Sequence, residues 1–498
     1  MNVEDLYWFS FILITLVGFY TFKLLTKNRS FFSIRGVPHE KPHLLYGNQN
    51  DTSGKLSALE HVHSFYKKFA DHKLFGFHQY QSPVFYIRDP DLIGKLWDEK
   101  HDHFENHGYF LDQSKDAILG NQLHLLKGEK WKRMRGTLSP TLDKSSVGKM
   151  HSLVQSNVNH FLDYLGSLAV GVEYDFKPII FQHVFNVYTS SSSGLKIDSF
   201  HDDSYMCREI STNILYGNVA SQTLKTFLFY LFPSIMKKMN VQLMSEAQTK
   251  FLLKMLRKST EEQDSDRSDF LTQLITASSD KNWNHEELIA QLLTFYGIGY
   301  DKMVNLLCFC VAELAINQSV QQKLLDETKS FSKGNIPLTY DSVNKMPYLE
   351  MVVQETLRKW PVSPSLDRTC SKDYQLIDGD LKVQFRRGDT VMVSVWALHR
   401  DEQLFPNPDE FNPERFDESV KANIRPNTFI PFGIGPRNCI GMHFALFAVK
   451  LTLVELVRKF ELIPGSKMAQ PIRLAKTAAS LEPEGGFWIQ FNKREARS

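Results

Sequence analysis

The most informative stretch of the sequence reads Pro431-Phe432-Gly433-Ile434-Gly435-Pro436-Arg437-Asn438-Cys439-Ile440-Gly441. The glycines let the backbone fold tightly around the sulfur of Cys439 and point amide N–H groups at it, while Phe432 can shield it from water. The apolar run that follows, residues 440–447, predicts a helix whose N-terminal end favours the anionic form of the cysteine. The stretch therefore predicts a thiolate, the form in which cysteine binds a metal.

Five positions of this stretch resemble the haem-binding loop of the cytochrome P450 family: Phe432, Gly435, Arg437, Cys439 and Gly441. In that family the cysteine is the axial ligand of haem b iron. Five fixed positions should coincide by chance in a chain of this length on the order of once in ten thousand sequences. The alternative is a buried structural cysteine after a glycine-rich turn. Residues 431–447 are most similar to animal microsomal members of the xenobiotic-metabolising type, and differ at His443, where arginine is common.

Helical periodicity dominates the chain, at residues 56–69, 147–165, 247–256, 286–316 and 440–460. Alternation typical of strands is confined to short pieces, at residues 391–395 and 487–491. We therefore expect a mainly helical protein with small β-sheets. The resemblance implies the cytochrome P450 fold, in which haem lies between a long central helix and the helix that follows the cysteine loop.

The N-terminus predicts a membrane anchor. Residues 6–22 contain no charge, and apolar character continues to residue 25, which is long enough to span a bilayer as a helix. Acidic residues precede this run and Lys23, Lys27 and Arg29 follow it, so the positive-inside rule places the remainder in the cytosol. A cleaved signal peptide is the alternative, but the basic residues lie on the wrong side of the run for one. We expect an uncleaved, single-pass anchor in the endoplasmic reticulum membrane.

Domain organisation follows from the same reading. A chain of 498 residues with 42% hydrophobic content can bury a large core, and its length alone suggests two or three domains. The resemblance implies one haem-thiolate catalytic domain, residues 51–498, after a signal-anchor helix at 1–25 and a proline-containing hinge at 26–50.

The overall charge is close to balance. A net charge of +2, with no basic tail, argues against nucleic acid as a partner. The five cysteines are an odd number without paired metal spacing, which fits a reducing compartment. Cys308 and Cys310 stand two apart on a predicted helix, where their side chains diverge, so we expect them in the core.

Glu355 and Arg358 stand three apart on a predicted helix and can pair. Arg415, in the segment Pro413-Glu414-Arg415-Phe416, could complete a network of one carboxylate and two guanidinium groups. Taken alone, such a pair is usually a solvated surface bridge. Its order in the chain, ahead of the cysteine loop, resembles the structural triad of the family.

Haem carries two propionates, and arginine suits carboxylates best. Four residues resemble the family's propionate donors: Trp131, Arg135, Arg368 and Arg437. Each of them alone would be read as surface charge or core. His107 stands where related microsomal members often have another arginine.

A basic cluster surrounds the predicted helix of Trp131, formed by Lys127, Lys130, Lys132 and Arg133. Such a face steers an acidic electron donor, although a solvated helix face explains it equally well. The resemblance implies an NADPH-dependent flavoprotein reductase as partner, and it allows a b-type cytochrome as a second donor.

The long predicted helix departs from the family pattern at Ile298-Gly299-Tyr300-Asp301-Lys302-Met303. The family carries an acid followed by threonine, whose hydroxyl helps deliver protons to iron-bound oxygen. This chain keeps the acid as Asp301 but has Lys302 in place of the threonine, and a charged lysine cannot accept a hydrogen bond. Burial in an apolar pocket would lower the pKa of Lys302; the alternatives are that it pairs with a carboxylate or, if neutral, reaches the iron. Thr294 shares the face of Asp301 two turns earlier, but we do not expect it to reach the iron.

Three outcomes remain open for Asp301 and Lys302 as catalytic residues. The first is a monooxygenase that inserts oxygen into an apolar small molecule, such as a xenobiotic, steroid or fatty acid, with protons relayed through water and Asp301. The second is an isomerase or dehydratase that needs no reductase. The third is a non-catalytic haem-binding protein. Retention of the cysteine loop and the other motifs favours the first.

Overall fold

The computed structural model of the chain describes residues 3–49, 55–108, 117–201, 225, 228, 236, 238–239, 246–261, 267–279, 281, 283–331, 338–476 and 481–494. The chain divides into two compact units, which are taken separately below. The first unit comprises Met1–Gly108 and Ser365–Ala397, and the second comprises Tyr109–Pro364 and Leu398–Ser498.

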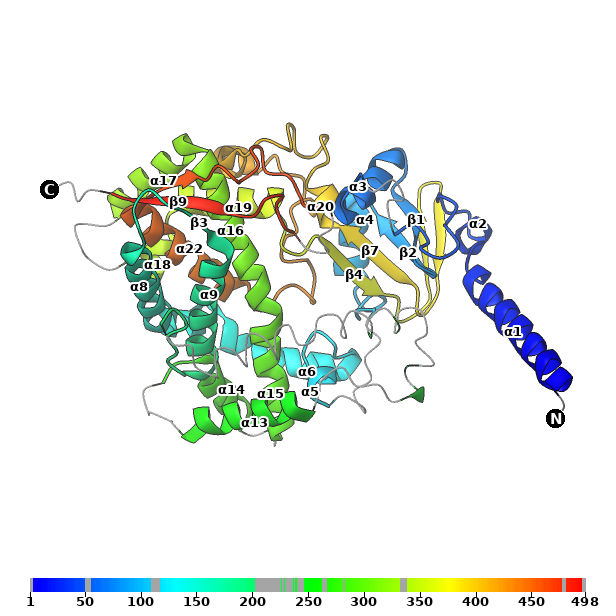
Figure 1. The fold of residues 1–498 in the computed structure, drawn as a ribbon. Helices are drawn as coiled ribbons and strands as arrows, with labels where there is room; N and C mark the ends of the chain where they lie inside the picture. Colours follow the sequence, from blue (N-terminus) through cyan, green and yellow to red (C-terminus); the bar gives the residue numbers. More distant parts are fainter. Residues whose placement is uncertain are drawn as a thin grey trace. The chain divides into compact units, whose positions relative to one another are not determined.

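The first unit holds most of the β-structure (Figure 1). Its helices are α1 (Val3–Thr26), α2 (Phe31–Ile34), α3 (Ala58–Lys68), α4 (Pro90–Gly94) and the π-helical turn η1 (Lys95–Glu99). Its strands are β1 (Leu74–Gln79), β2 (Ser82–Ile87), β4 (Ser365–Thr369), β5 (Tyr374–Asp378), β6 (Leu381–Phe385) and β7 (Thr390–Ser394). The order β1-β2-β7-β4 forms a four-stranded sheet in which only β2 and β7 run parallel, and β5 and β6 form a hairpin. The short helix α20 (Val395–Leu398) ends at the boundary of the two units.

Aromatic packing joins α2 and α3 to this sheet. Helix α3 begins with a capping box between Ser57 and Glu60, and its apolar face packs with Phe75 and Phe77 of β1. Phe32 of α2 is fully buried against Gly76, where a β-carbon would come within 2.4 Å of the phenyl ring. A glycine at position 76 is therefore what allows α2 to lie on the strand.

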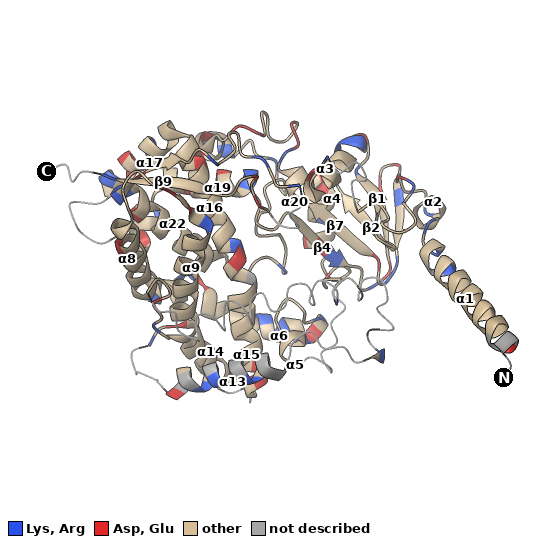
Figure 2. Cartoon of the chain, viewed as in Figure 1, with Lys and Arg blue, Asp and Glu red and all other residues tan. Residues whose placement is uncertain are grey.

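Helix α1 is apolar along most of its length, and Figure 2 draws it almost entirely in the colour of uncharged residues. Within it, Tyr7–Lys23 counts as a short apolar helix. Within the described parts of the chain, no helix alone combines the length and the hydropathy needed to cross a membrane. One bent pair, His285–Ile316 with Gln318–Phe331, meets both conditions together, by length and composition only.

The second unit is mainly helical (Figure 1). Its first helices are α5 (Ala117–Gly120), α6 (Gly128–Leu138), the 3-10 turn η2 (Ser139–Leu142), α7 (Lys144–Lys149), α8 (His151–Ser167), α9 (Phe176–Ser193), α13 (Glu246–Glu261), α14 (Phe270–Ser278) and α15 (His285–Leu293). They are followed by the π-helical turn η4 (Thr294–Ile298), α16 (Gly299–Ile316), α17 (Gln318–Phe331), α18 (Tyr340–Asn344), α19 (Pro347–Lys359), the 3-10 turn η5 (Pro413–Phe416), α21 (Glu418–Lys421) and α22 (Met442–Lys459). A small sheet has the order β3 (Glu173–Asp175), β9 (Trp488–Lys493), β8 (Phe460–Pro464).

Helix α16 forms the core of this unit. Its side chains from Met303 to Ala315 are all buried, and it packs against α9, α19, α22 and β8. Cys308 and Cys310 are fully buried in it as free thiols, which confirms their expected place in the core. The predicted long helix at residues 286–316 is thus present as α15, η4 and α16.

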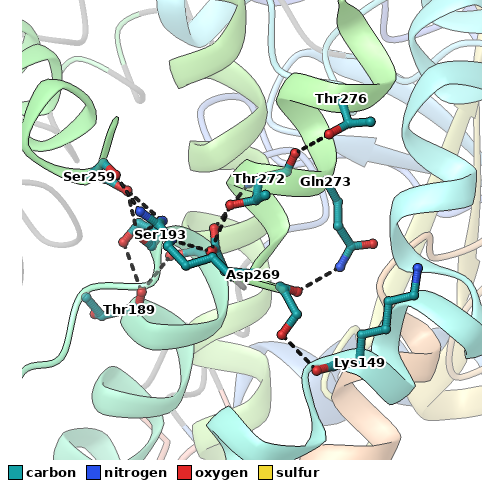
Figure 3. A network of polar contacts seen from close by, with 11 residues as sticks. Lys149, Thr189, Ser193, Ser259, Asp269, Thr272, Gln273 and Thr276 are labelled. Atoms are coloured by element: carbon teal, nitrogen blue, oxygen red, sulfur yellow. Dashed lines mark hydrogen bonds and ion pairs between the residues drawn. The ribbon is translucent and has the colours of Figure 1, made fainter. Parts of the chain in front are cut away.

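A buried polar network ties α9, α13 and α14 together (Figure 3). Asp269 caps α14 and accepts hydrogen bonds from the backbone and the hydroxyl of Thr272. The guanidinium of Arg267 pairs with Asp269 at 2.8 Å and also donates to the carbonyls of Ser193 and Ser259. This network fixes the end of α9, the helix that packs against α16.

The predicted elements are confirmed with local differences. Residues 147–165 form two helices rather than one, because α7 ends at Lys149 and α8 begins at His151 after the non-helical Met150. The last residue of the predicted helix 440–460, Phe460, opens strand β8 instead. The two predicted strands are present as β7 and β9.

Candidate functional site

The loop before α22 has the tight geometry that its glycines predict. Gly433 and Gly435 have φ angles of 73° and 69°, in the left-handed region that favours glycine. The backbone N–H of Cys439 donates to the carbonyl of Phe432 at 2.8 Å, and that of Asn438 donates to Gly435 at 3.1 Å. These bonds close the loop and hold the cysteine at its end, just before the first turn of α22.

The thiol of Cys439 lies in an electropositive setting. The surrounding protein desolvates the sulfur, and this desolvation holds the pKa of the thiol above its usual value. A hydrogen bond from the Gly441 N–H and the charges of Arg135 and Lys302 lower the pKa and oppose that rise. A coordinated cation would add its own charge and deprotonate the thiol outright. The donor set therefore fits a thiolate that binds iron.

Helix α6 is fastened to the same loop by two arginines. Arg135 donates from both terminal nitrogens to Asn438, one bond reaching the carbonyl and one the side-chain oxygen, each 2.7 Å long. Arg437 lies over the indole of Trp131 at 4.0 Å and donates to the carbonyl of Leu126 at 2.7 Å. Three of the four predicted propionate donors, Trp131, Arg135 and Arg437, are thus brought together around Cys439.

The opposite face of α6 carries exposed charge. Its exposed cations are Lys127, Lys130, Lys132 and Arg133, whereas Trp131 and Met134 on the inner face are buried. Lys132 forms an exposed ion pair with Glu129 at 3.0 Å. The basic cluster expected from the sequence is therefore accessible from outside.

The predicted network of Glu355, Arg358 and Arg415 is confirmed. Arg358 binds both carboxylate oxygens of Glu355, at 2.7 and 2.8 Å, and both side chains are fully buried. Arg415 lies 3.4 Å from the same carboxylate. The remaining donors of Arg358 reach the carbonyls of His399 and Glu410, and the ring of His399 accepts a hydrogen bond from the backbone of Ile430. The network thus holds in place the segment around Ile430, which leads into the cysteine loop.

The start of α16 has an irregular backbone. The turn η4 immediately precedes Gly299, and such π-helical turns are frequent at functional sites. Gly299 allows a close approach, because a β-carbon there would lie 2.2 Å from the hydroxyl oxygen of Tyr188. Burial raises the pKa of the Tyr188 hydroxyl, and the nearby Cys439 contributes to this rise. The side chain of Ile298 lies outside what the structure describes.

Asp301 and Lys302 have different surroundings. Asp301 is exposed and accepts a hydrogen bond from the side chain of Asn305 at 3.2 Å. Lys302 is partly buried, and its ammonium donates to the Ser363 hydroxyl at 2.9 Å and to the Val362 carbonyl at 3.2 Å. Burial lowers the pKa of Lys302, against the charges of Asp301 and Cys439, which raise it. In the described part of the chain, no carboxylate lies within ion-pair distance of this ammonium.

The hydroxyl of Thr294 is committed elsewhere. It donates to the carbonyl of Ala290 at 2.9 Å and accepts a hydrogen bond from the backbone of Leu123 at 3.1 Å. These bonds tie η4 to the segment before α6, which agrees with the expectation that Thr294 does not replace the missing threonine.

Arg368 and His107 belong to the first unit. Arg368 is buried, lies 4.8 Å from the ring centre of Trp97 and donates to the carbonyl of Asp367. The ring of His107 lies 3.1 Å from the carboxylate of Asp367, which also accepts a bond from the Gly108 N–H. Burial alone would raise the pKa of Asp367, but His107, Gly108 and Arg368 together lower it. His107 therefore holds a carboxylate beside Arg368.

Sequence reasoning missed several residues at this site. Asn438 accepts hydrogen bonds from Arg135, Ser363 accepts one from Lys302, and Tyr188 lies against Gly299 at the start of α16, yet none of the three was predicted as a site residue. Tyr188 and Ser363 are distant in sequence from their partners, so spacing gives no signal for them. Only Asn438, which lies inside the cysteine loop, could have been identified from its position.

A mainly helical fold with a cysteine just before a helix N-terminus and arginines around it is the arrangement that suits a protein of the cysteine-ligated iron class. The family model described as cytochrome P450 matches residues 37–490. The chain belongs to the cytochrome P450 family, a family of monooxygenases that bind haem b with a cysteine thiolate as axial ligand.

Individual relatives match along almost the whole chain. Probable cytochrome P450 9f2 of Drosophila melanogaster is 31% identical over 515 residues, which cover 98% of this chain and 99% of the relative. Cytochrome P450 9e2 of Blattella germanica is 30% identical over 533 residues, covering 99% of each. Cytochrome P450 3A29 of Sus scrofa is 33% identical over 504 residues, covering 98% of this chain and 95% of the relative. These relatives agree with the predicted similarity to animal, xenobiotic-type members.

Proposed function

We propose that this protein is a membrane-attached monooxygenase of the endoplasmic reticulum that inserts one atom of dioxygen into an apolar small molecule, with electrons derived from NADPH. The observation that carries the proposal is the setting of Cys439. Two backbone hydrogen bonds close the loop, and the sulfur accepts a hydrogen bond from the N–H of Gly441. The side chains of Arg135 and Lys302 supply positive charge nearby. Haem bound to this thiolate would supply the oxygen-activating chemistry.

Residues of the cysteine loop position the sulfur of Cys439, and other residues would bind the haem propionates. Gly433 and Gly435 shape the loop, and the N–H of Gly441 donates to the sulfur at the start of α22. In our proposal Phe432 shields this sulfur from water. The propionate-binding residues in this proposal are those that the family resemblance implies: Trp131, Arg135, Arg368 and Arg437. His107 is a positioning residue, because its ring holds the carboxylate of Asp367 beside Arg368.

Asp301 and Lys302 handle protons in this proposal. Asp301 is exposed, so its carboxylate can exchange protons with water and pass them inward. Lys302 has a lowered pKa and only neutral acceptors at Ser363 and Val362, so its ammonium can give up a proton more readily than a surface lysine. In this proposal the amine of Lys302 takes the place of the family's threonine hydroxyl, beside the acid that is kept as Asp301.

The partners follow from the exposed surfaces. The family generally accepts electrons from an NADPH-dependent flavoprotein reductase, and we assign the docking face to the exposed cations of α6. A b-type cytochrome would use the same charge complementarity. Helix α1, with its apolar stretch Tyr7–Lys23, attaches the protein to the membrane, where apolar substrates such as xenobiotics, steroids or fatty acids concentrate.

The test is NADPH-dependent dioxygen uptake by the haem-loaded, full-length protein with a generic reductase. Controls are the reductase alone and the Cys439→Ala variant. Uptake clearly above both controls supports the monooxygenase, and a screen for oxygenated products then identifies the substrate class. No uptake by protein that binds haem and can be reduced would contradict the proposal and support a reductase-independent isomerase or a haem-binding role. A normal ferrous carbonyl thiolate spectrum from Cys439→Ala would refute the ligand assignment.

A further inference from the structure

The first unit contains a cavity of about 520 Å³ beside the segment that follows α1. One wall comes from α2 and the residue after it, with Phe31, Ile34 and Arg35. The other wall comes from the β5–β6 hairpin and the residue after it, including Lys382, Gln384 and Arg386. None of the monooxygenase chemistry proposed above uses these residues.

The lining is positively charged. Arg35, Lys382 and Arg386 contribute three cations, and the described residues that line the cavity include no acidic side chain. Arg35 is held by an ion pair with Asp389 and lies 3.9 Å above the ring of Phe31. Lys382 and Arg386 are exposed and have no carboxylate within ion-pair distance among the described residues. Their charges are therefore free of internal compensation and suit an anion.

The rim of the cavity is apolar. Ile34 is 81% exposed, whereas its neighbour Phe32 is fully buried in the unit. Phe31 and Val383 add apolar surface to the lining. A large apolar side chain beside uncompensated cations matches a ligand with an anionic end and a hydrocarbon end.

The cavity lies close in sequence to α1. Helix α1 ends at Thr26 and Phe31 follows five residues later, so even an extended chain, at about 3.5 Å per residue, keeps them within about 20 Å. The intervening residues are tied to the unit, because Asn28 donates to the carbonyl of Gln81 at 2.8 Å and Arg29 to that of Pro42 at 3.2 Å. If α1 enters a bilayer, the cavity lies near the lipid headgroups.

We propose that this cavity binds the headgroup of an acidic glycerophospholipid, with Lys382 and Arg386 on the anionic group and Ile34 and Phe31 against the first methylenes of the acyl chains. This inference rests on the membrane attachment proposed above. The bound lipid would hold the first unit against an acidic patch of membrane.

The experiment measures lipid binding to the full-length protein in neutral detergent by native mass spectrometry. The probes are dioctanoyl phosphatidylserine and, as a neutral match, dioctanoyl phosphatidylcholine. We expect the wild type to prefer the serine lipid by about tenfold or more, since each cation near a headgroup contributes about a fivefold change in affinity. The double variant Lys382→Gln/Arg386→Gln should bind both lipids equally.

A matched pair of exposed cations in the same unit, Lys67 and Lys100, provides the control. The double variant Lys67→Gln/Lys100→Gln removes the same charge outside the cavity and should keep the wild-type preference within about twofold. Equal loss of preference in both double variants, or retention of preference in the cavity variant, would overturn the proposal. All four positions are exposed, so the thermal midpoint of each variant should match the wild type.

Two further arms separate the lipid from its headgroup and from membrane attachment. Free glycerophosphoserine should not displace the serine lipid at matched concentration, and Ile34→Ser should weaken both lipids alike. Efficient displacement would overturn the lipid assignment in favour of a soluble phosphate ester. Flotation of the cavity variant Lys382→Gln/Arg386→Gln with neutral vesicles tests membrane attachment by α1 separately. The variant should still float, so loss of lipid preference can be distinguished from loss of membrane attachment.

Discussion

Two cations of the second unit, Arg358 and Lys302, show how differently one fold can treat a charge. Arg358 is fully buried, and two of its guanidinium nitrogens donate hydrogen bonds to the two carboxylate oxygens of Glu355, which is also fully buried. Lys302 is partly buried and donates only to the neutral oxygens of Ser363 and Val362. The first charge is neutralised and fixes structure. The second has only neutral hydrogen-bond acceptors, and burial lowers its pKa, so its proton is the more easily moved.

The largest expected effect breaks the neutralised site. Glu355→Ala leaves Arg358 buried without its carboxylate and should lower the free energy of unfolding by about 3–5 kcal/mol. Urea titration of the purified protein measures this. The control Glu129→Ala removes an exposed partner of Lys132 and should cost about 0–1 kcal/mol. Similar losses in the two variants would mean that the buried network is not the stronger support.

Acid should weaken the same region. Burial, with the charge of Arg358, lowers the pKa of His399 to about 3, whereas the unfolded chain binds the proton near 6.5. As the pH falls, the His399 side chain is therefore protonated in the unfolded state before it is protonated in the folded state. The free energy of unfolding decreases below about pH 6.5 for this reason. Between pH 7 and pH 5 the loss should be about 2 kcal/mol. His399→Gln should flatten the pH dependence by this amount, and an unchanged slope would show that His399 protonates normally.

A smaller effect concerns the second cation, Lys302. Lys302→Thr restores the threonine hydroxyl of the family and should lower the amount of peroxide released per NADPH consumed by a factor of about two to ten. This factor corresponds to a change of at most about 1.4 kcal/mol in the difference between the barriers of the two competing steps. The ratio of peroxide to NADPH, measured with reductase, tests this. Ser363→Ala removes the partner of Lys302 without adding a hydroxyl and should bring no such fall. An unchanged ratio in Lys302→Thr would place Lys302 outside the proton path.

The smallest effect concerns stability at Lys302. Because burial lowers its pKa, the charged ammonium is disfavoured in the folded state and costs stability wherever the unfolded lysine is charged. Lys302→Met should therefore raise the melting temperature slightly at pH 7. The advantage should shrink as the pH rises towards 10.5, where the unfolded lysine also loses its proton. A gain that is constant with pH would point to packing instead.

The sequence was most informative where function needs fixed spacing. The Cys439 loop, its positive-φ glycines and the Glu355 network all follow from short motifs, because neighbouring residues must act together. The contacts of Lys302 with Ser363 and of His107 with Asp367 join residues 61 and 260 positions apart. Such pairs depend on tertiary packing, which local periodicity does not encode. The break at Met150 was missed for the same reason, since both flanking segments keep helical spacing.

The turn η4 bears on how this site could have arisen. A π-helical turn holds one residue more than the α-helical path requires, and each residue turns an α-helix by about 100°. Removing that residue would rotate Asp301 and Lys302 relative to Thr294 and the elements packed around them. The face that α16 shows to the cysteine is therefore set by a count of residues as well as by their identity. A change of length, and not only of side chain, could redirect the chemistry of this helix.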